Sequence, residues 1–138
     1  MKKSAFTMIE LVFVIVVLGI LAAVAVPRLA ATRVDAQIAK GRADVASIRS
    51  AIITERQSRL FRGDSTFITT ANMDNGGLFG GVMQYPIAAR TADGHWRATT
   101  PGAVYAFRIQ GADNQFTYNP ANGTFLCTGG AQCSALTD

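Results

Sequence analysis

Few side chains in this chain could carry out chemistry. Among its 138 residues there is one histidine, His95, and there are two cysteines, Cys127 and Cys133. Nucleophilic catalysis by serine or cysteine normally needs a neighbouring base, but His95 stands beside Trp96 in a predicted strand, which favours a structural or surface histidine. One histidine and two cysteines are also too few ligands for a zinc site of the usual kind. We therefore expect no catalytic residue and no zinc site.

Carboxylates, glycines and basic residues do not gather into a ligand site either. Calcium needs several oxygen ligands close together, and the aspartates of the predicted loops are dispersed. These are Asp64, Asp74, Asp93 and Asp113. Gly76-Gly77 and Gly80-Gly81 lack the lysine and the strand that a phosphate-binding loop requires. The thirteen lysines and arginines are interleaved with nine carboxylates, so nucleic acid is not indicated as a partner. The sequence predicts a protein without enzyme activity, metal or cofactor.

The strongest signal is an apolar segment near the N-terminus. Hydrophobic residues make up 49% of the chain and charged residues only 16%, so part of the apolar surface must face something other than water. Residues 6–26 form an almost unbroken apolar run, which as a helix would span roughly 31 Å, about one hydrocarbon thickness. Lys2 and Lys3 precede this run, which predicts a single membrane pass with the lysines in the cytoplasm.

Two residues do not suit an ordinary membrane anchor. Glu10 is a carboxylate inside the apolar run. Such a group costs about 3 kcal/mol on insertion scales, and an ionisable side chain at membrane depth usually has a function. Pro27 follows the run, and a proline inside a continuing helix removes one hydrogen bond, which predicts a kink.

Two stretches of this segment carry a resemblance to a known family. They read Ala5-Phe6-Thr7-Met8-Ile9-Glu10-Leu11 and Leu18-Gly19-Ile20-Leu21-Ala22-Ala23-Val24-Ala25-Val26-Pro27. About the first 30 residues resemble the N-terminal segment of type IV prepilins and type II secretion pseudopilins, with leader, Phe, Glu, Gly and Pro at the family's spacings. The family usually has glycine before its cleavage point, where this chain has Ala5.

The resemblance implies a processing pathway and a filament. A prepilin peptidase would cut between Ala5 and Phe6 on the cytoplasmic face, and Phe6 would then be N-methylated. The product would be a structural subunit of a bacterial type IV filament, either a type II secretion pseudopilus or a type IV pilus. Its implied partners are further copies of itself, other pilin-like subunits and the inner-membrane assembly machinery. The subunit would cross the inner membrane once, with its C-terminal domain in the periplasm, and then enter an extracytoplasmic filament.

Glu10 has two interpretations. Cleavage would create an α-amino group on Phe6, and in the family the glutamate is thought to pair with the N-terminus of a neighbouring subunit. A cation and a carboxylate attract strongly in a low dielectric, and each alone is costly to bury, so assembly would offset both charges. The alternative is a local pairing within the chain, because Glu10 lies in the first helical turn near the positive end of the helix dipole.

A different class of function remains open for the chain as a whole. The basic start, the apolar core and Ala23-Val24-Ala25 also suit a secretory signal peptide. Cleavage after Ala25 would release a soluble periplasmic binding domain with a disulfide. Glu10 and the length of the apolar run speak against this alternative, because signal peptides need an apolar core of only about 7–15 residues.

Residues 28–62 are predicted to continue the helix beyond the membrane. Apolar and small residues at intervals of three and four form one stripe, which predicts a packed face. They are Val34, Ile38, Gly41, Val45, Ile48 and Ile52. Gly63 is a natural C′ cap for the end of the helix. A second stripe, at seven-residue spacing, is charged, and we interpret it as a solvated face or as a contact with a neighbouring subunit or an acidic partner. It consists of Asp35, Arg42, Arg49 and Arg56.

Residues 63–138 are predicted to form a loop and then a small β-sheet unit. Glycine, asparagine and aspartate over residues 63–81 indicate loop and turns. Alternation predicts strands at residues 95–99, 103–110, 116–119 and 124–128, the last two joined by a hairpin at residues 120–123. The expected fold is α+β, a pilin-like lollipop in which a long N-terminal helix packs against three or four antiparallel strands. Its segments are residues 1–5, 6–27, 28–62 and 63–138.

Cys127 and Cys133 enclose the sequence Thr-Gly-Gly-Ala-Gln. An exported domain meets an oxidising compartment, which favours a disulfide between them. Closing so short a loop would stabilise the fold by roughly 2–3 kcal/mol on the entropic account. A disulfide loop at the C-terminus also resembles that of many type IV pilins.

Overall fold

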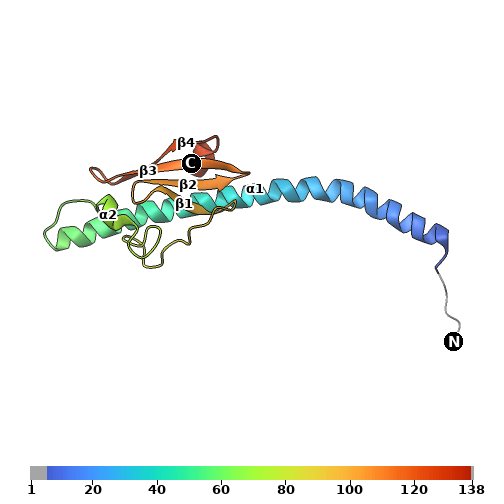
Figure 1. Ribbon diagram of the computed structural model, residues 1–138, viewed down its shortest axis with the longest axis horizontal. Helices are drawn as coiled ribbons and strands as arrows, with labels where there is room; N and C mark the ends of the chain where they lie inside the picture. Colours follow the sequence, from blue (N-terminus) through green and yellow to red (C-terminus); the bar gives the residue numbers. More distant parts are fainter. Residues whose placement is uncertain (1–5, 138) are drawn as a thin grey trace, which may run out of the picture. The chain divides into compact units, whose positions relative to one another are not determined.

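The computed structural model describes residues 6–137 and contains one long helix and a four-stranded antiparallel sheet, which confirms the α+β prediction. Figure 1 shows the elements coloured in chain order. Besides the long helix there are two short ones, α2 and α3. Their bounds are α1 Met8–Phe61, α2 Thr70–Met73, β1 Trp96–Thr100, β2 Val104–Ile109, β3 Ala112–Asn119, β4 Thr124–Gly129 and α3 Cys133–Thr137. The chain divides into two compact units between Asp35 and Ala36. We call residues 6–35 the stem and residues 36–137 the head.

Helix α1 ends as its sequence predicts. Gly63 has a φ of 84°, and its N–H donates to the carbonyl of Leu60 over 3.0 Å. The N–H of Asp64 donates to the carbonyl of Arg59 over 2.9 Å. This pair of bonds is a Schellman cap, in which glycine supplies the left-handed conformation at no steric cost. The cap satisfies carbonyls that the last turn would otherwise leave without a partner.

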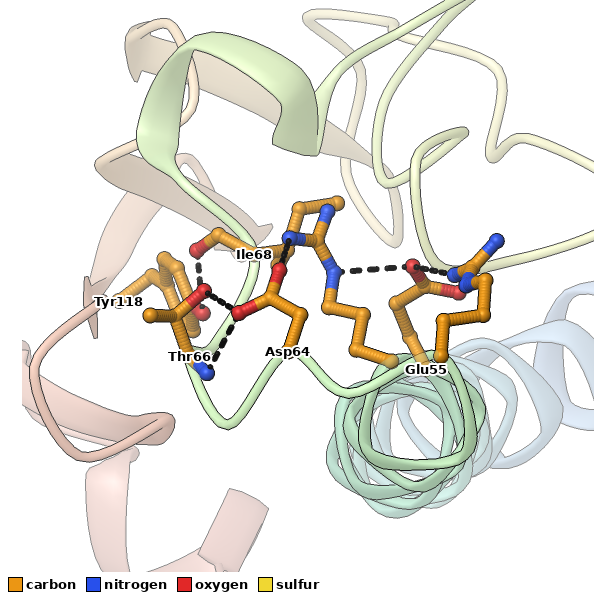
Figure 2. A network of polar contacts seen from close by, with 7 residues as sticks. Glu55, Asp64, Thr66, Ile68 and Tyr118 are labelled. Carbon is orange, nitrogen blue, oxygen red and sulfur yellow. Dashed lines mark hydrogen bonds and ion pairs between the residues drawn. The ribbon is translucent and has the colours of Figure 1, made fainter.

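A polar network surrounds this cap (Figure 2). Arg59 lies between Glu55, at 3.0 Å, and Asp64, at 3.3 Å. Asp64 also accepts hydrogen bonds from the N–H and the hydroxyl of Thr66, over 2.9 and 2.7 Å. The hydroxyl of Thr66 contributes most to holding the pKa of Asp64 below its usual value, and Arg59 adds to the shift. Glu55 and Arg59 therefore form an i, i+4 ion pair on the helix, and Asp64 extends it into the loop after the helix.

The sheet is an antiparallel meander in the order β1-β2-β3-β4. A two-residue turn of Gln110 and Gly111 joins β2 to β3, and both residues have positive φ, at 50° and 77°. This geometry belongs to a type I′ turn, whose twist matches that of the flanking strands. The predicted hairpin at residues 120–123 joins β3 to β4 and ends on Gly123, which has a φ of 70°.

Aromatic side chains form the core of the head. Trp96, Tyr105, Phe107, Phe116 and Phe125 are all buried, and Phe116 stacks on Phe125 with ring centroids 5.3 Å apart. This apolar face lies against the buried stripe of α1, where Gly41, Val45, Ile48 and Ile52 are the buried residues. The packing of sheet against helix predicted from the periodicity is therefore confirmed for the part of the stripe that lies in the head.

Three features of the head differ from the sequence prediction. Phe79 lies in a segment predicted to be loop, yet it is fully buried and stacks on Tyr105 with centroids 4.2 Å apart. The same segment contains α2, and the chain after Cys127 contains α3. Strand β3 begins four residues earlier than predicted, at Ala112. Short helices and a single buried aromatic residue leave no periodicity in the sequence, which is why the pattern did not reveal them.

The arginines of the charged stripe make contacts within the head that the sequence prediction did not include. Arg42 donates to the carbonyl of Ala135 over 2.7 and 3.1 Å, and Arg49 donates to the carbonyl of Phe125 over 3.0 Å. The guanidinium of Arg56 lies 4.1 Å from the ring centroid of Phe67. These arginines stand beside the buried stripe and are long enough to reach backbone carbonyls and a ring elsewhere in the head. Arg49 and Arg56 are half-buried, whereas Arg42 and Asp35 are exposed, so the stripe is partly solvated while its arginines also bind groups of the head.

Asp74 is a polar clamp that the sequence did not reveal. Its Oδ1 accepts from the N–H of Phe79 over 3.0 Å and from the hydroxyl of Tyr105 over 2.7 Å, and its Oδ2 accepts from the N–H of Gly102 over 2.6 Å. Burial, and then the neighbouring Asp74 carboxylate, raise the pKa of Tyr105 well above its usual range. One carboxylate therefore fixes the loop after α2 to strand β2 and to the turn before it.

Candidate functional site

The surface of the stem is the most unusual feature of the molecule. Large apolar side chains are exposed from Phe6 to Leu29, with exposed fractions between 37% and 82%. Helix α1 includes a stretch long and apolar enough to cross a membrane, and none of that stretch is buried. Exposed apolar surface of this extent is not stable against water and marks a segment for another environment. By length and composition, that environment is a lipid bilayer or other apolar helices.

Glu10 is fixed locally by a capping box at the start of α1. Its Oε2 accepts hydrogen bonds from the N–H and the hydroxyl of Thr7, both over 3.3 Å. The Thr7 hydroxyl in turn accepts from the N–H of Glu10 over 3.3 Å. This reciprocal arrangement of an N-cap threonine and a glutamate three residues later satisfies backbone donors that a helix start leaves free. The local interpretation of Glu10 therefore has a definite geometry.

The carboxylate also borders apolar surface that nothing in the stem covers. A shallow hollow of about 310 Å³ is lined by Glu10 together with Phe6, Leu11, Val14 and Ile15. Phe6 is 81% exposed. The capping bonds use Oε2 of Glu10. Its Oε1 has no hydrogen-bond partner among the described residues, so it can accept a bond from a cation that arrives from outside the chain.

The structure describes some of the other residues singled out in the sequence and leaves others outside the described range. Ala5, the residue before the predicted cut, lies outside the described residues, as do Lys2 and Lys3. Pro27 lies inside α1, which continues through it, and the kink remains a prediction. Cys127 and Cys133 form the expected disulfide, which joins the end of β4 to the first residue of α3.

The remaining candidates for chemistry do not come together. His95 makes a hydrogen bond with the carbonyl of Asp93 through Nδ1, over 3.0 Å. Asp93 faces Arg108 at 3.4 Å and accepts from the N–H of Gly111. Over residues 6–137 no group of three or more histidine, cysteine, aspartate or glutamate side chains is placed to hold a metal ion. These polar residues tie loops to strands.

Thr7 is the one residue of this site that the sequence analysis missed. The pattern Thr-x-x-Glu before an apolar run is a helix-start signal that identifies such a threonine. The apolar context drew attention to the charge of Glu10 and away from its spacing to Thr7.

Comparison with known families decides what kind of N-terminus this is. Residues 1–26 match the family described as the prokaryotic N-terminal methylation motif. This motif is the leader signature of type IV pilins and pseudopilins. Comparison with curated proteins gives no significant match, and comparison with solved structures gives none either. The prepilin signature covers the capping box, most of the exposed apolar surface and the hollow beside Glu10, and it supports a type IV pilin-like protein.

Proposed function

We propose that this protein is a non-enzymatic structural subunit of a bacterial type IV filament, either a type II secretion pseudopilus or a type IV pilus. The observation that carries the proposal is a single carboxylate, Glu10, within residues 6–29 of the stem, where the large apolar side chains are exposed. Such a stem suits storage in a bilayer and then burial among the stems of other subunits. The prepilin signature over residues 1–26 supports the same conclusion.

The proposed life cycle assigns a task to each segment. Residues 1–5 are the leader, which prepilin peptidase removes between Ala5 and Phe6, and Phe6 is then N-methylated. Residues 6–27 cross the inner membrane once and later form the filament core, with a kink at Pro27. Residues 28–62 continue the helix onto the sheet, and residues 63–138 form the periplasmic loop and β-sheet unit. Its partners are further copies, other pilin-like subunits and the inner-membrane assembly machinery.

Glu10 has both a local and an assembly role in this proposal. The capping box holds the carboxylate at the start of α1 before assembly. In the filament the same carboxylate faces the new α-amino group of Phe6 on a neighbouring subunit. Pairing the two charges in a low dielectric offsets the cost of burying each and fixes how far one stem is displaced along the next.

Comparing Glu10→Gln with Thr7→Ala separates the two roles. Glutamine also serves in a capping box, so Glu10→Gln keeps the cap and removes the charge, whereas Glu10→Ala removes both. We expect both variants to insert in the membrane and both to give few or no filaments by electron microscopy. Thr7→Ala is the matched control, because it removes the cap partner and leaves the charge, and its filaments should form. Normal filaments from Glu10→Gln would contradict the pairing of charges.

The processing step has a direct measurement. The intact mass of the purified chain should show the loss of residues 1–5 and the gain of one methyl group. Loss of residues 1–25 would instead support the alternative, a soluble periplasmic binding domain released by a conventional signal peptidase after Ala25. A chain of full mass in cells that assemble filaments would contradict the proposed cut.

A further inference from the structure

The C-terminal helix α3 is too short to be stable by itself. It has five residues, Cys133–Thr137, and isolated helices shorter than about 12 residues are marginal in water. Its order therefore depends on the tethers at its ends and on what its side chains pack against. At its N-terminal end the tethers are the disulfide from Cys133 to Cys127 and the N–H of Gln132, which donates to the side chain of Asn114 over 2.9 Å.

Helix α3 contacts β4 and, through Leu136, the first buried turn of α1. Leu136 is fully buried, and its Cδ2 lies 2.6 Å from the position that a Cβ on Gly41 would occupy. The same Cβ would lie 2.5 Å from Cε1 of Phe107. Arg42, the next residue of α1, donates two hydrogen bonds to the carbonyl of Ala135. Gly41 is therefore the place where α1, β2 and α3 meet, and only a residue without a side chain fits there.

We propose that oxidation of Cys127 and Cys133 is a switch that docks α3 onto Gly41 of α1. We call the contacts of Gly41 and Arg42 with Leu136 and Ala135 the latch. The latch closes when the two thiols are oxidised to a disulfide. They give two protons and two electrons to the disulfide of an oxidising protein or small molecule, and this oxidant is released as a dithiol. This inference rests on the proposed function in one respect: the filament pathway places the head in an oxidising compartment.

Other contacts near Gly41 hold the sheet to α1 without involving α3. The sheet can therefore stay folded when the latch opens. Lys40 donates to the carbonyl of Gly94, and Trp96 donates to Asp44 over 3.0 Å. Both contacts hold β1 and the loop before it to α1 and involve no residue of α3. The reduced protein should therefore keep its sheet on the helix and lose only the order of α3.

Coupling between the latch and the disulfide is reciprocal, which gives a sharp test. The full-length protein in detergent micelles is equilibrated with mixtures of reduced and oxidised dithiothreitol, and the thiols are trapped and counted. Gly41→Ala should shift the equilibrium toward the dithiol on the order of tenfold, because the added methyl group opens the latch. Gly19→Ala is the matched control, because no atom lies within 4 Å of the added Cβ, and its equilibrium should equal that of the wild type.

A second variant covers the case in which Gly41→Ala fails to fold. Arg42→Ala removes the two hydrogen bonds to Ala135 and adds no atoms, and it should shift the equilibrium in the same direction by a smaller factor. The proposal is wrong if Arg42→Ala has the same thiol–disulfide equilibrium as the wild type and Gly41→Ala, where it folds, has that equilibrium too.

Hydrogen exchange gives an independent readout. The N–H of Leu136 donates to the carbonyl of Gln132 over 3.0 Å, so it is protected only while α3 is formed. Reduction should remove this protection and leave the amides of β2 and β3 protected. Unchanged exchange at Leu136, or loss of protection across the whole sheet, would overturn the proposal. Both measurements use dispersed protein in micelles, so they remain valid if the protein forms no filament.

Discussion

Apolar and charged side chains have different surroundings in the stem and in the head. In the head, aromatic residues bury one another, and Arg42, Arg49 and Arg56 of α1 bind backbone carbonyls or a ring within the same unit. In the stem, leucines, isoleucines and valines are exposed, and Glu10 has only its capping bonds. Most apolar side chains of the head's core are covered within the chain, whereas the large apolar side chains of the stem are left exposed.

Two glycines of α1 illustrate this difference. A Cβ on Gly41 would collide with Phe107 and Leu136, but a Cβ on Gly19 would meet no atom within 4 Å. Gly41 is therefore explained by contacts within the chain. Gly19 has no such explanation within the described residues, and close approach of another apolar helix is a common reason for a small residue in such a stem.

The largest expected effect comes from the centre of the head. Trp96 is fully buried and its indole N–H donates to Asp44, so Trp96→Ala should lower the free energy of unfolding of the head by about 3–5 kcal/mol. Urea unfolding followed by far-ultraviolet circular dichroism measures this change. Tyr85→Ala is the control, because Tyr85 is 78% exposed, and it should change the value by less than about 0.5 kcal/mol. Equal losses in the two variants would contradict the core described above.

A smaller effect is expected from the polar clamp. Asp74→Ala leaves the hydroxyl of Tyr105 and two backbone N–H groups without their acceptor, and it should lower the free energy of unfolding by about 2 kcal/mol. Asp35→Ala removes an exposed stem carboxylate for which the structure shows no hydrogen bond over residues 6–137, and it should leave the head unchanged. If both variants unfold at the same urea concentration, Asp74 does not act as a clamp.

A still smaller effect on the stability of the head is expected when the pH is lowered. The folded-state pKa of Asp64 is lowered by the hydroxyl of Thr66, so the contribution of this carboxylate is present above its unfolded value of 3.8. It is lost as the pH falls from that value through the folded pKa. Urea midpoints measured from pH 6 downwards should show a weaker acid dependence in Asp64→Asn than in the wild type. An identical slope in both proteins would remove Asp64 from the acid response.

The smallest effect on the head is expected from the stem. Leu21 is exposed, so Leu21→Ala should change the free energy of unfolding of the head by less than about 0.5 kcal/mol in micelles. The same substitution should reduce filament yield, because assembled stems would bury this side chain. A destabilised head in Leu21→Ala would show that the two regions are not as independent as their contacts indicate.

Periodic and local features of this fold could be predicted from the sequence because neighbouring residues determine them. The apolar run of the stem, the stripe from Gly41 to Ile52, the cap at Gly63 and the hairpin at residues 120–123 each depend on a short stretch of chain. The acid in the apolar run was predicted to have a function for the same reason. Thr7 lay within reach of this reasoning, because its spacing to Glu10 is a known helix-start pattern.

Other features depend on which distant segments meet, and only the tertiary structure decided them. The bonds of Arg42 and Arg49 to backbone carbonyls cannot be foreseen until Ala135 and Phe125 are placed beside them. Asp74 is one loop aspartate among several until Gly102 and Tyr105 reach it. Gly41 became informative only when Leu136, 95 residues later in the chain, was found against it. Contacts between residues so far apart follow from the packing of the whole head, and no local pattern of residues encodes them.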